Sequence, residues 1–247
     1  MLPILSLAKD NPEPLSPIPT KDYSKRKYYT APYFAKPGEV GDLFGYSNFI
    51  KGNPIKADYA LIDLETSGLK AKDSHIIEIA VIRMNRRGEV ISQFNTLINP
   101  PNGEVGMTNL HLINKVDVVG APTFAEAAGD ILQSLDNAIV VAHNAKFEES
   151  FLAAEFNGMG LLDLPHIPSI DTMYLSQMAF DMPHHKLADV LSHYGYPYEN
   201  AHTALGDVVS MARFLPQLLD ELPEQLFPIE FTRLPKLALS NKRKPRG

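Results

Sequence analysis

The sequence predicts an α/β fold in which a mixed sheet is covered by helices on both faces. Three apolar runs follow one another closely at residues 59–65, 76–84 and 90–98, and an Arg-Arg-Gly turn at residues 86–88 separates the last two. Tight spacing around a Gly-containing turn favours antiparallel pairing of neighbouring runs. Helical and strand patterns then alternate along the rest of the chain, as is typical of a mixed α/β sheet covered by helices.

The later elements carry recognisable start and stop signals. A helix is expected to begin after Pro122, and Gly158 and Gly195 each close a later helical pattern. Pro216 predicts a kink or an early stop in the last helix. The expected elements are a helix at 123–135, a strand at 138–142, and helices at 146–157, 171–180, 186–194 and 203–219.

Composition divides the chain into three parts. Residues 1–56 contain 8 of the 20 prolines and no sustained apolar periodicity, which is typical of an irregular arm. Within this arm, residues 43–50 carry aromatic side chains that are expected to pack on the main domain. Residues 57–222 form the predicted folded domain, and residues 223–247 form a C-terminal extension with a basic tail.

Charge is distributed unevenly. The net charge is +3 over residues 1–56 (8 Lys/Arg, 5 Asp/Glu), −14 over residues 57–235 (10 against 24) and +5 over residues 236–247 (5 against none). A domain this acidic is a poor generic nucleic-acid binder unless metal ions offset part of the charge. Basic residues alternate with aromatic ones at 21–30, and residues 242–246 are also basic. Both stretches suit contact with nucleic acid, but such segments are more often an ordinary solvated linker or tail, which is what we expect here.

Composition also excludes several classes of site. The chain has no cysteine, so disulfides, thiolate metal sites and cysteine nucleophiles are excluded. No apolar run approaches the roughly 18 residues of a membrane span. No basic residues precede the short apolar start, so a secretory signal is not expected. We therefore expect no membrane partner and a cytoplasmic location.

Two acids end the first predicted strand. Residues 60–68 read Ala-Leu-Ile-Asp-Leu-Glu-Thr-Ser-Gly, so Asp63 and Glu65 lie on one face of the strand and Leu64 on the other. Neighbouring carboxylates repel each other, and a bound divalent cation is the simplest way to hold them together. The alternative is a strand end that leaves two solvated acids.

Further acids follow at separated positions. Glu148 comes after an apolar strand that ends at His143, and Asp207 lies in the last helix, five residues after His202. Carboxylates from three elements can surround a pair of hard cations about 3.5–4 Å apart, which is an arrangement that acts on phosphodiesters. A nearby histidine can take a proton from the attacking water. His143 ends a buried strand and is expected to be structural.

Three motifs occur in order and begin at positions 63, 143 and 202: Asp-x-Glu-Thr-x-Gly, His-Asn-Ala-x-Phe-acid and His-x-x-x-x-Asp. Together they resemble the DEDD 3′–5′ exonucleases over residues 58–220, and most of all the epsilon proofreading subunits of bacterial replicative polymerases. The other branch of this family has a tyrosine four residues before the last aspartate. That position is Thr203 here, so the chain resembles the histidine branch.

The resemblance implies a ribonuclease-H-like fold, an exonuclease domain at residues 57–222 and release of nucleoside monophosphates from single-stranded 3′ ends, of DNA more than RNA. It implies two divalent cations, Mg²⁺ or Mn²⁺, and suggests a DNA polymerase subunit as a partner. The implied general base is His202. The implied metal ligands are Asp63, Glu65, Glu148 and Asp207, and the implied contacts to the terminal nucleotide are Thr66, His111, Asn144 and Phe147.

Two positions depart from the family pattern. Glu148 stands where relatives usually have Asp, and its extra methylene adds roughly 1.5 Å of reach. Its carboxylate either binds metal after a small shift of the helix or leaves one metal site weak. Glu149 points about 100° away on a helix, which favours Glu148 as the ligand. Leu112 replaces a common Gly and is expected to narrow the path of the nucleotide.

Three functions are consistent with these residues. The first is a metal-dependent 3′–5′ exonuclease of the proofreading or repair type that acts on single-stranded DNA ends. The second is an RNA-trimming member of the same family, similar to the oligoribonucleases. The third, motivated by Glu148 and Leu112, is a degenerate member that binds nucleic acid or a polymerase without cutting.

Overall fold

A computed structural model describes residues 35–36, 38–46, 48–50, 57–85, 87–199, 202–221, 225–227 and 232–246. The basic and aromatic stretch at 21–30 lies outside the described residues. Among the helices that are described, none is long and apolar enough to cross a membrane.

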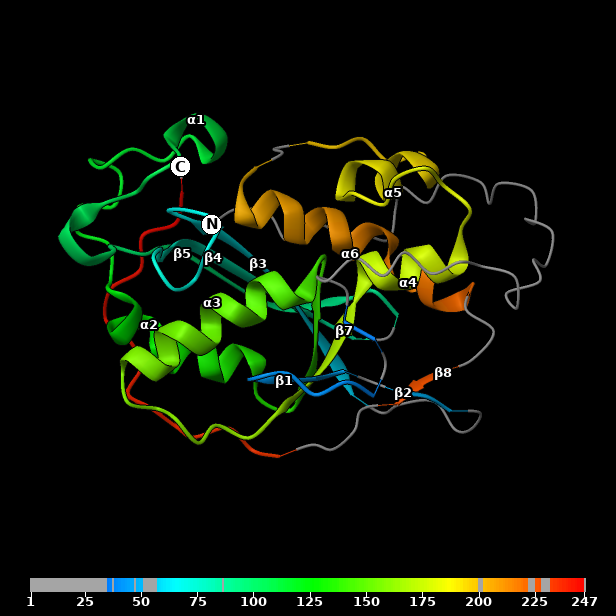
Figure 1. Ribbon diagram of the computed structural model, residues 1–247, viewed down its shortest axis with the longest axis horizontal. Coiled ribbons are helices and arrows are strands. Elements are labelled where there is room, and N and C mark those ends of the chain that lie inside the picture. Colours follow the sequence, from blue (N-terminus) through cyan, green and yellow to red (C-terminus); the bar gives the residue numbers. More distant parts are fainter. Residues whose placement is uncertain are drawn as a thin grey trace.

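The main sheet, as far as the chain is described, has six strands in the order β1-β7-β6-β3-β4-β5 (Figure 1). These strands are β1 (Phe44–Tyr46), β3 (Asp58–Thr66), β4 (Ile76–Met84), β5 (Val90–Leu97), β6 (Ala138–Ala142) and β7 (Ile167–Asp171). The β3–β4 and β4–β5 pairs are antiparallel, whereas β3–β6, β6–β7 and β1–β7 are parallel. The predicted mixed sheet with three antiparallel strands is confirmed, while β1 and β7 were not predicted. A separate antiparallel pair joins β2 (Asn48–Ile50) to β8 (Gln225–Phe227).

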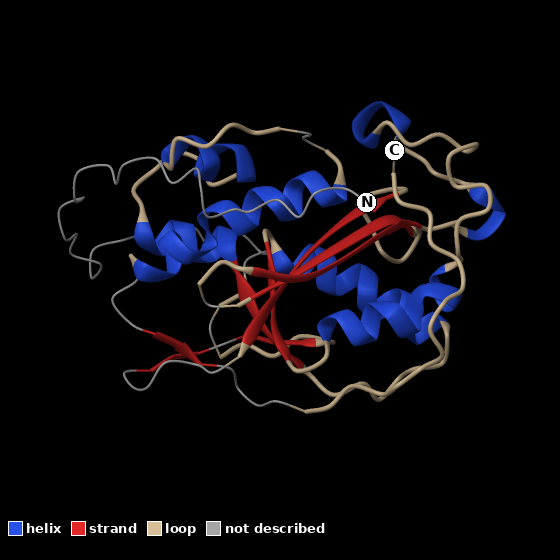
Figure 2. Cartoon of the chain, turned by 180° about the vertical axis from the view of Figure 1, so that it is seen from behind, coloured by secondary structure: helices blue, strands red, loops and turns tan. Residues whose placement is uncertain are grey.

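Helices cover both faces of this sheet, as predicted (Figure 2). They are α1 (Thr108–His111), α2 (Phe124–Leu135), α3 (Ala145–Gly158), α4 (Thr172–Ala179), α5 (Leu187–His193) and α6 (Ala204–Asp220), with a 3₁₀ helix at Pro101–Gly103. One apolar core packs α2 and α3 against the sheet, and a second packs α4, α5 and α6 against the opposite face. Alternation along β3 supplies both cores, since Ile62 and Leu64 enter the first and Leu61 enters the second.

Local signals fix most helix ends. The side chain of Thr123 accepts the backbone N–H of Glu126, and Glu126 accepts the N–H of Thr123 in return, which forms a capping box at the start of α2. Pro216 lies inside α6, and the helix continues to Asp220, which confirms the predicted helix at 203–219 and excludes the early stop, one of the two effects expected of Pro216. Fully buried residues on α6, including Phe214, anchor the helix to the core on either side of the lost hydrogen bond.

Part of the predicted N-terminal arm belongs to the sheet. Leu43, Phe44 and Tyr46 are buried, which confirms the expected packing for this part of residues 43–50. Glu149 on α3 anchors β1, because its Oε1 accepts the backbone N–H groups of Leu43 (2.9 Å) and Phe44 (2.6 Å). Its Oε2 accepts the hydroxyl of Tyr46 at 2.8 Å. The division of the chain at residue 57 stays a prediction.

Residues 232–246, which we call the C-terminal strap, follow α2 and then β5 without forming a helix or strand (Figure 1, red). The strap is fixed at its start by Asp136, whose Oδ1 accepts the backbone N–H of Leu234 at 2.9 Å. Farther along, the backbone N–H of Leu97 donates to the carbonyl of Lys244 at 2.8 Å. The expectation of a solvated tail at 242–246 is therefore wrong for its C-terminal part, because the edge strand β5 offers unpaired backbone groups to the strap.

Candidate active site

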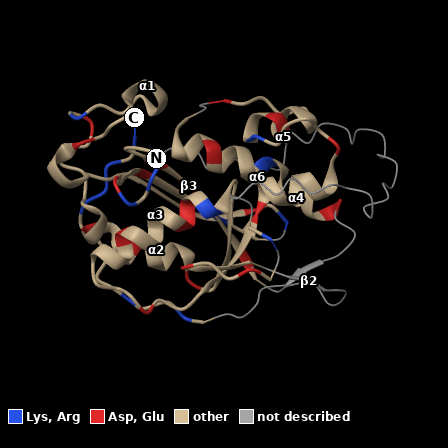
Figure 3. Cartoon of the chain, viewed as in Figure 1, with Lys and Arg blue, Asp and Glu red and all other residues tan. Residues whose placement is uncertain are grey.

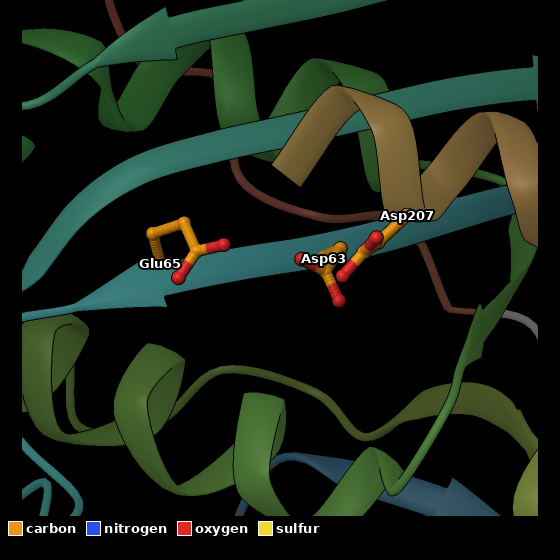
Figure 4. Close-up of side chains that lie close together, drawn as sticks. All are labelled: Asp63, Glu65 and Asp207. Carbon is orange, nitrogen blue, oxygen red and sulfur yellow. The ribbon is translucent and has the colours of Figure 1, made fainter. Parts of the chain in front are cut away.

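Three acidic side chains converge where β3 meets the start of α6 (Figure 4). Carboxylate oxygens of Asp63, Glu65 and Asp207 all lie within 4.8 Å of one another. Strand alternation places the first two on one face of β3, and an irregularity in the β3–β4 pairing follows directly after Glu65. Thr203 caps α6 by accepting the backbone N–H of Gly206 at 3.0 Å, which directs Asp207 in the first turn toward β3.

The carboxyl groups of this cluster bind protons more tightly than isolated acids do. Burial raises the pKa of Asp63 well above its usual value, and the charge of Asp207 adds to the rise. Burial, followed by the charge of Glu78, raises the pKa of Glu65 to about 7. Burial also raises the pKa of Asp207 to about 6, although the hydroxyl of Tyr198 donates a hydrogen bond to it. Such values are typical of acids that lack a compensating positive charge.

Glu148 lies beside this cluster but outside the group of three. Its side chain is buried in the first turn of α3, and its Oε2 has no hydrogen-bond partner among the described residues. Burial raises the pKa of Glu148 well above its usual value, and the charges of Asp171 and Glu65 raise it further. The carboxylate of the neighbouring Glu149 accepts hydrogen bonds from the β1 region, so only Glu148 of this pair faces the cluster. A buried oxygen without a donor indicates that a binding partner is missing from the chain itself.

His202 lies on the segment that leads into α6. Its side chain is exposed, and its backbone has a left-handed conformation with φ of 62°. The backbone N–H of His202 donates to Asp207, and a positive charge on its imidazole lowers the pKa of Asp207. The hydroxyl of Tyr198 donates to Asp207 Oδ1 at 2.9 Å, and the ring of Tyr198 lies 6.5 Å from that of His202. The predicted base therefore lies beside the predicted ligand, and Tyr198 is a neighbour that the sequence did not reveal.

Three of the expected nucleotide contacts border the cluster in sequence, and their side chains differ in availability. Thr66 is buried, and its hydroxyl donates to the carbonyl of Gly68 at 2.7 Å. Asn144 has a left-handed backbone, and its Oδ1 is a buried acceptor without a partner in the described part of the chain. Phe147 is half-buried, with its ring centroid 4.9 Å from that of Phe151. Asn144 thus keeps an unused acceptor, whereas the Thr66 hydroxyl is already engaged.

His111 does not present its ring to a ligand. It is fully buried, its Nε2 donates to the carbonyl of Val105 at 3.1 Å, and its Nδ1 accepts the backbone N–H of Ile113 at 3.0 Å. The expected nucleotide contact by this side chain is corrected accordingly: the ring braces its own loop. Leu112, next to it, has φ of 59° and a side chain that is 66% exposed. A left-handed backbone at this position explains why glycine suits it.

Two further charged residues reach the site without having been predicted. Glu78 on β4 pairs with Glu65 on β3, is fully buried, and leaves its Oε1 without a partner among the residues described. Its Oε2 accepts the backbone N–H of Ala204 and the guanidinium of Arg246, both at 3.3 Å. A single acid inside the apolar run of β4 was the available signal for Glu78. The sequence offered no signal for Arg246, which arrives from a distant part of the chain.

His143 is held as a structural residue would be. Its Nε2 donates to the carbonyl of His185 at 2.9 Å, and its Nδ1 lies 3.0 Å from the hydroxyl of Thr172. Burial lowers the pKa of His143 to about 4. A neutral imidazole at the end of β6 therefore joins β6 to α4 and the segment before α5.

The described residues fit divalent cations with a preference for oxygen. The donors are carboxylates only, and they come from β3, α3 and α6, whose acidic positions gather around the middle of the fold (Figure 3). Hard cations such as Mg²⁺ and Mn²⁺ favour such donors. The raised pKa values and the unpaired Oε2 of Glu148 are what an acidic site has when the described residues supply too little positive charge to neutralise its carboxylates.

Comparison with known proteins identifies a family pattern across this region. The sequence model of the RNase_T family, described as Exonuclease, matches residues 61–215, which is more than half of the chain. Its span begins in β3 and ends in α6, so it contains every residue of the acidic cluster.

Several bacterial proteins have related sequences. DNA polymerase III subunit epsilon of Treponema pallidum is 31% identical over 153 residues, which cover 60% of this chain and 70% of that protein. DNA polymerase III PolC-type of Clostridium perfringens is 28% identical over 220 residues, which cover 84% of this chain. The chain spans only 15% of that relative's length, and 11% of the length of the PolC-type protein of Lacticaseibacillus paracasei.

Solved structures share the fold. The nuclease domain of 3′hExo, described as a DEDDh family member bound to rAMP, aligns with a TM-score of 0.59 and 17% identity and covers 73% of this chain and all (100%) of that one. A full-length 3′-exonuclease aligns with a TM-score of 0.57 and 19% identity and covers 77% of this chain and 97% of that one. The predicted ribonuclease-H-like fold is confirmed by these similarities.

Proposed function

The chain belongs to the exonuclease family whose pattern spans residues 61–215, and from its site we propose that it is a metal-dependent 3′–5′ exonuclease. The proposed reaction is hydrolysis of the last phosphodiester at a single-stranded 3′ end, with release of a nucleoside monophosphate. DNA is the proposed substrate, in a proofreading or repair role.

One observation carries this proposal. Acids that are 144 positions apart in the sequence, Asp63 and Asp207, bring their oxygens within 4.8 Å of each other and of Glu65. Burial and mutual repulsion make this arrangement unfavourable for the protein alone. The convergence of these acids is explained when divalent cations and a phosphodiester bind between them.

The residues that would hold two divalent cations, Mg²⁺ or Mn²⁺, are Asp63, Glu65, Glu148 and Asp207. When bound, such a pair stabilises the attacking and leaving oxygens of a phosphodiester displacement. Glu148 is the outlying member of this set, because its carboxylate lies outside the group of three. Tyr198 would orient Asp207 through the hydrogen bond between its hydroxyl and Oδ1.

His202 is the proposed general base. Its exposed imidazole lies next to Asp207, where a ring nitrogen can take the proton of the attacking water. Asn144 and Phe147 are proposed to border the terminal nucleotide, Asn144 through its unused amide oxygen and Phe147 through its ring. Thr66 is proposed to border it through its backbone, because its hydroxyl is engaged.

A second candidate is removal of nucleotides from RNA by the same site. The nuclease domain of 3′hExo is bound to rAMP, a ribonucleotide, which favours this alternative. The names of the sequence relatives refer to DNA polymerase III and favour DNA, and they also support a polymerase subunit as a partner. A non-cutting member that only binds nucleic acid or a polymerase is the third candidate. A cytoplasmic location remains a prediction from the sequence.

The test is degradation of end-labelled single-stranded DNA and RNA oligonucleotides of matched sequence, with Mg²⁺ or Mn²⁺ titrated from zero. We expect mononucleotides to appear from the 3′ end of the DNA, and no cleavage with a chelator. A DNA substrate with a blocked 3′ end and the variant Asp63→Ala are the controls. Wild-type protein that leaves all substrates as intact as Asp63→Ala does would contradict the enzyme proposal, and faster decay of RNA than of DNA would favour the second candidate.

A further inference from the structure

The C-terminal strap is attached to the domain along its whole described length. Its first part is held by Asp136, which accepts the guanidinium of Arg233 (2.8 Å) and the backbone N–H of Leu234 (2.9 Å). Its middle part is held by Asp130, which accepts the backbone N–H of Ser240 at 2.8 Å. These acids lie on and just after α2, so the strap runs back along α2 from its C-terminal end.

A glycine in α2 is matched to this path. A Cβ on Gly129 would lie 2.1 Å from the carbonyl oxygen of Ala238, a distance that real Cβ atoms do not reach. Glycine inside a helix lowers helix stability relative to alanine. The close approach of the strap explains the glycine, because a side chain at position 129 would collide with the strap. The sequence of α2, and not only that of the strap, is therefore suited to this path.

The strap next reaches the edge strand β5. Arg243 donates from Nε to the carbonyl of Asn95 at 3.0 Å, and its guanidinium lies 5.3 Å from the ring centroid of Phe94. The backbone N–H of Lys244 donates to Thr96 Oγ1 at 3.0 Å, and its carbonyl accepts the N–H of Leu97. These bonds fix the direction in which the chain continues, because backbone pairing on both sides of a residue leaves little rotational freedom.

Arg246 then enters the acidic site. Its Nη1 donates to Glu78 Oε2 at 3.3 Å and to the carbonyl of His202 at 3.2 Å. Its Nη2 donates to the carbonyl of His111 at 2.5 Å. One planar guanidinium therefore joins strand β4, the last residue of α1 and the segment that carries His202. Only arginine has a rigid fork that satisfies several acceptors at once in this way.

We propose that Arg246 is a positioning residue of the exonuclease site: the strap delivers it to hold the His202 segment against β4 and the C-terminal end of α1. The inference rests on the proposed function, because it assigns a role in the reaction of that site.

The backbone of His202 gives the reason for such support. A left-handed conformation at a residue other than glycine is unfavourable and persists when neighbouring contacts enforce it. The bond from Arg246 to the His202 carbonyl is one such contact. It is made on the backbone side of His202, so the imidazole stays exposed and available for proton transfer.

Geometry favours support over two other roles for Arg246. Its side chain is only 20% exposed, and its donors are directed to three protein acceptors, which leaves little of it for an incoming phosphate. The guanidinium donates to the main-chain carbonyls of His111 and His202, so its bond to His202 is made to the backbone and not to the imidazole ring.

The test compares wild type, Arg246→Ala and the matched control Lys242→Ala in steady-state degradation of single-stranded DNA. Lys242 belongs to the same strap, but its Nζ pairs with Glu126 at the exposed start of α2. We expect Arg246→Ala to lower kcat by at least about tenfold, with KM changed less than about threefold, because a misplaced base slows the chemical step. Lys242→Ala should keep wild-type values. Added guanidinium chloride at millimolar concentration should restore part of kcat in Arg246→Ala only.

The outcomes separate this inference from the proposed function. Inactive wild-type protein would contradict the proposed function. Active wild type with an unchanged kcat in Arg246→Ala would overturn the inference alone. A higher kcat in Arg246→Ala would overturn it in favour of a blocking strap, and a raised KM with unchanged kcat would overturn it in favour of a substrate contact.

A second variant covers the case in which Arg246→Ala fails to fold. Arg246→Lys keeps the charge and the length but not the fork, and it is expected to fold with a melting temperature within a few degrees of wild type. We expect it to lose at least about threefold in kcat, because one ammonium cannot hold both carbonyls and Glu78 in the same geometry. Wild-type kcat in Arg246→Lys would overturn the inference.

Discussion

Two sets of buried acids lie close together around α3 and differ in what faces their oxygens. Glu149 accepts hydrogen bonds from two backbone N–H groups and one hydroxyl of the β1 region, and Asp171 accepts from four backbone N–H groups. Asp63 and Glu148 instead face other carboxylates, and Oε2 of Glu148 has no partner in the described residues. Glu148 and Glu149 are adjacent in sequence, yet they belong to different sets.

The difference teaches how to separate structural acids from functional ones in this fold. A buried carboxylate that is supplied with donors stabilises the elements that donate to it. A buried carboxylate that is surrounded by like charge destabilises the protein until a cation arrives. Sequence position does not distinguish the two sets, whereas the inventory of donors does. Four changes test the contrast, beginning with the largest expected effect.

Asp63→Ala should abolish activity while leaving the metal-free fold intact. We expect activity to fall by more than about 100-fold, which is the upper end of the range for residues that only orient a metal ligand. The free energy of unfolding in chelator should stay the same or rise, because one repelling charge is removed from the cluster. Oligonucleotide degradation and urea unfolding measure the two quantities. Asp163→Ala, at an exposed acid after α3, is the control, and equal activities of the two variants would contradict the assignment.

Glu149→Ala should have the opposite profile. It leaves three donors of the β1 region without their acceptor, so we expect a loss of about 3 kcal/mol or more in the free energy of unfolding. The cation concentration for half-maximal activity should not change in the folded protein. Glu149→Gln, which keeps the acceptor oxygen, should be much milder. A shifted cation requirement with unchanged stability would assign Glu149 to the metal site and break the contrast.

The unpaired acids also predict how the stability of the metal-free protein depends on pH. The pKa of Glu65 rises from 4.5 to about 7 on folding, and that of Asp207 from 3.8 to about 6. A folded state with raised carboxyl pKa values binds more protons than the unfolded state does. The stabilisation that comes from this proton binding is fully present below about pH 4 and is lost as the pH rises through about 7. Glu65 alone contributes at most about 3 kcal/mol. Melting temperatures in chelator should therefore fall over this range, and added Mg²⁺ should restore most at the upper end.

Two comparisons sharpen the pH experiment. Asp63→Asn should flatten the pH dependence, since it removes a carboxyl group whose own pKa is raised well above its usual value in the folded protein. Glu149→Gln should leave the slope unchanged, because Glu149 belongs to the set that is supplied with donors. A melting temperature that increases steadily up to about pH 7 in chelator would mean that the acids of the cluster are ionised without penalty.

Glu148→Asp should give the smallest effect. The carboxylate of Glu148 already lies outside the group of three, and a shorter side chain on the same helix moves it farther away. We expect about a tenfold loss of kcat and a higher cation requirement, from a displacement on the order of 1 Å. Activity titrated against Mg²⁺ measures both. A gain in rate would show instead that glutamate handicaps the site and would favour the degenerate alternative.

Most of the fold was predictable because its signals are local. Alternation along residues 59–65, the apolar run at 76–84 and the Gly88 turn specify antiparallel neighbours without further information. The capping box at Thr123 specifies the start of α2. The strands that escaped prediction are short, and β1 and β7 are recognisable only by the parallel pair that they form with each other. Pro216 did not prevent prediction of α6 to residue 219, and tertiary packing holds the helix past it.

The functional site likewise contains residues that the sequence predicted and residues that it did not. The spacing of motifs located Asp63, Glu65, Asp207 and His202, because strand period and helix start fix where such side chains point. The ring of His111 was misassigned, because its two hydrogen bonds depend on how the loop from Val105 to Ile113 closes.

By itself, the sequence determined the four strands β3, β4, β5 and β6, the helices from α2 to α6 and the identity of the converging acids, since each follows from periodicity, caps and motif order within short windows. Only the tertiary structure decided that Glu149 serves β1 while Glu148 faces the cluster, that Glu78 and Tyr198 border it, and that Arg246 reaches it. Those outcomes depend on contacts between residues that are distant along the chain, and burial sets the energy of each charge only once the layers have packed.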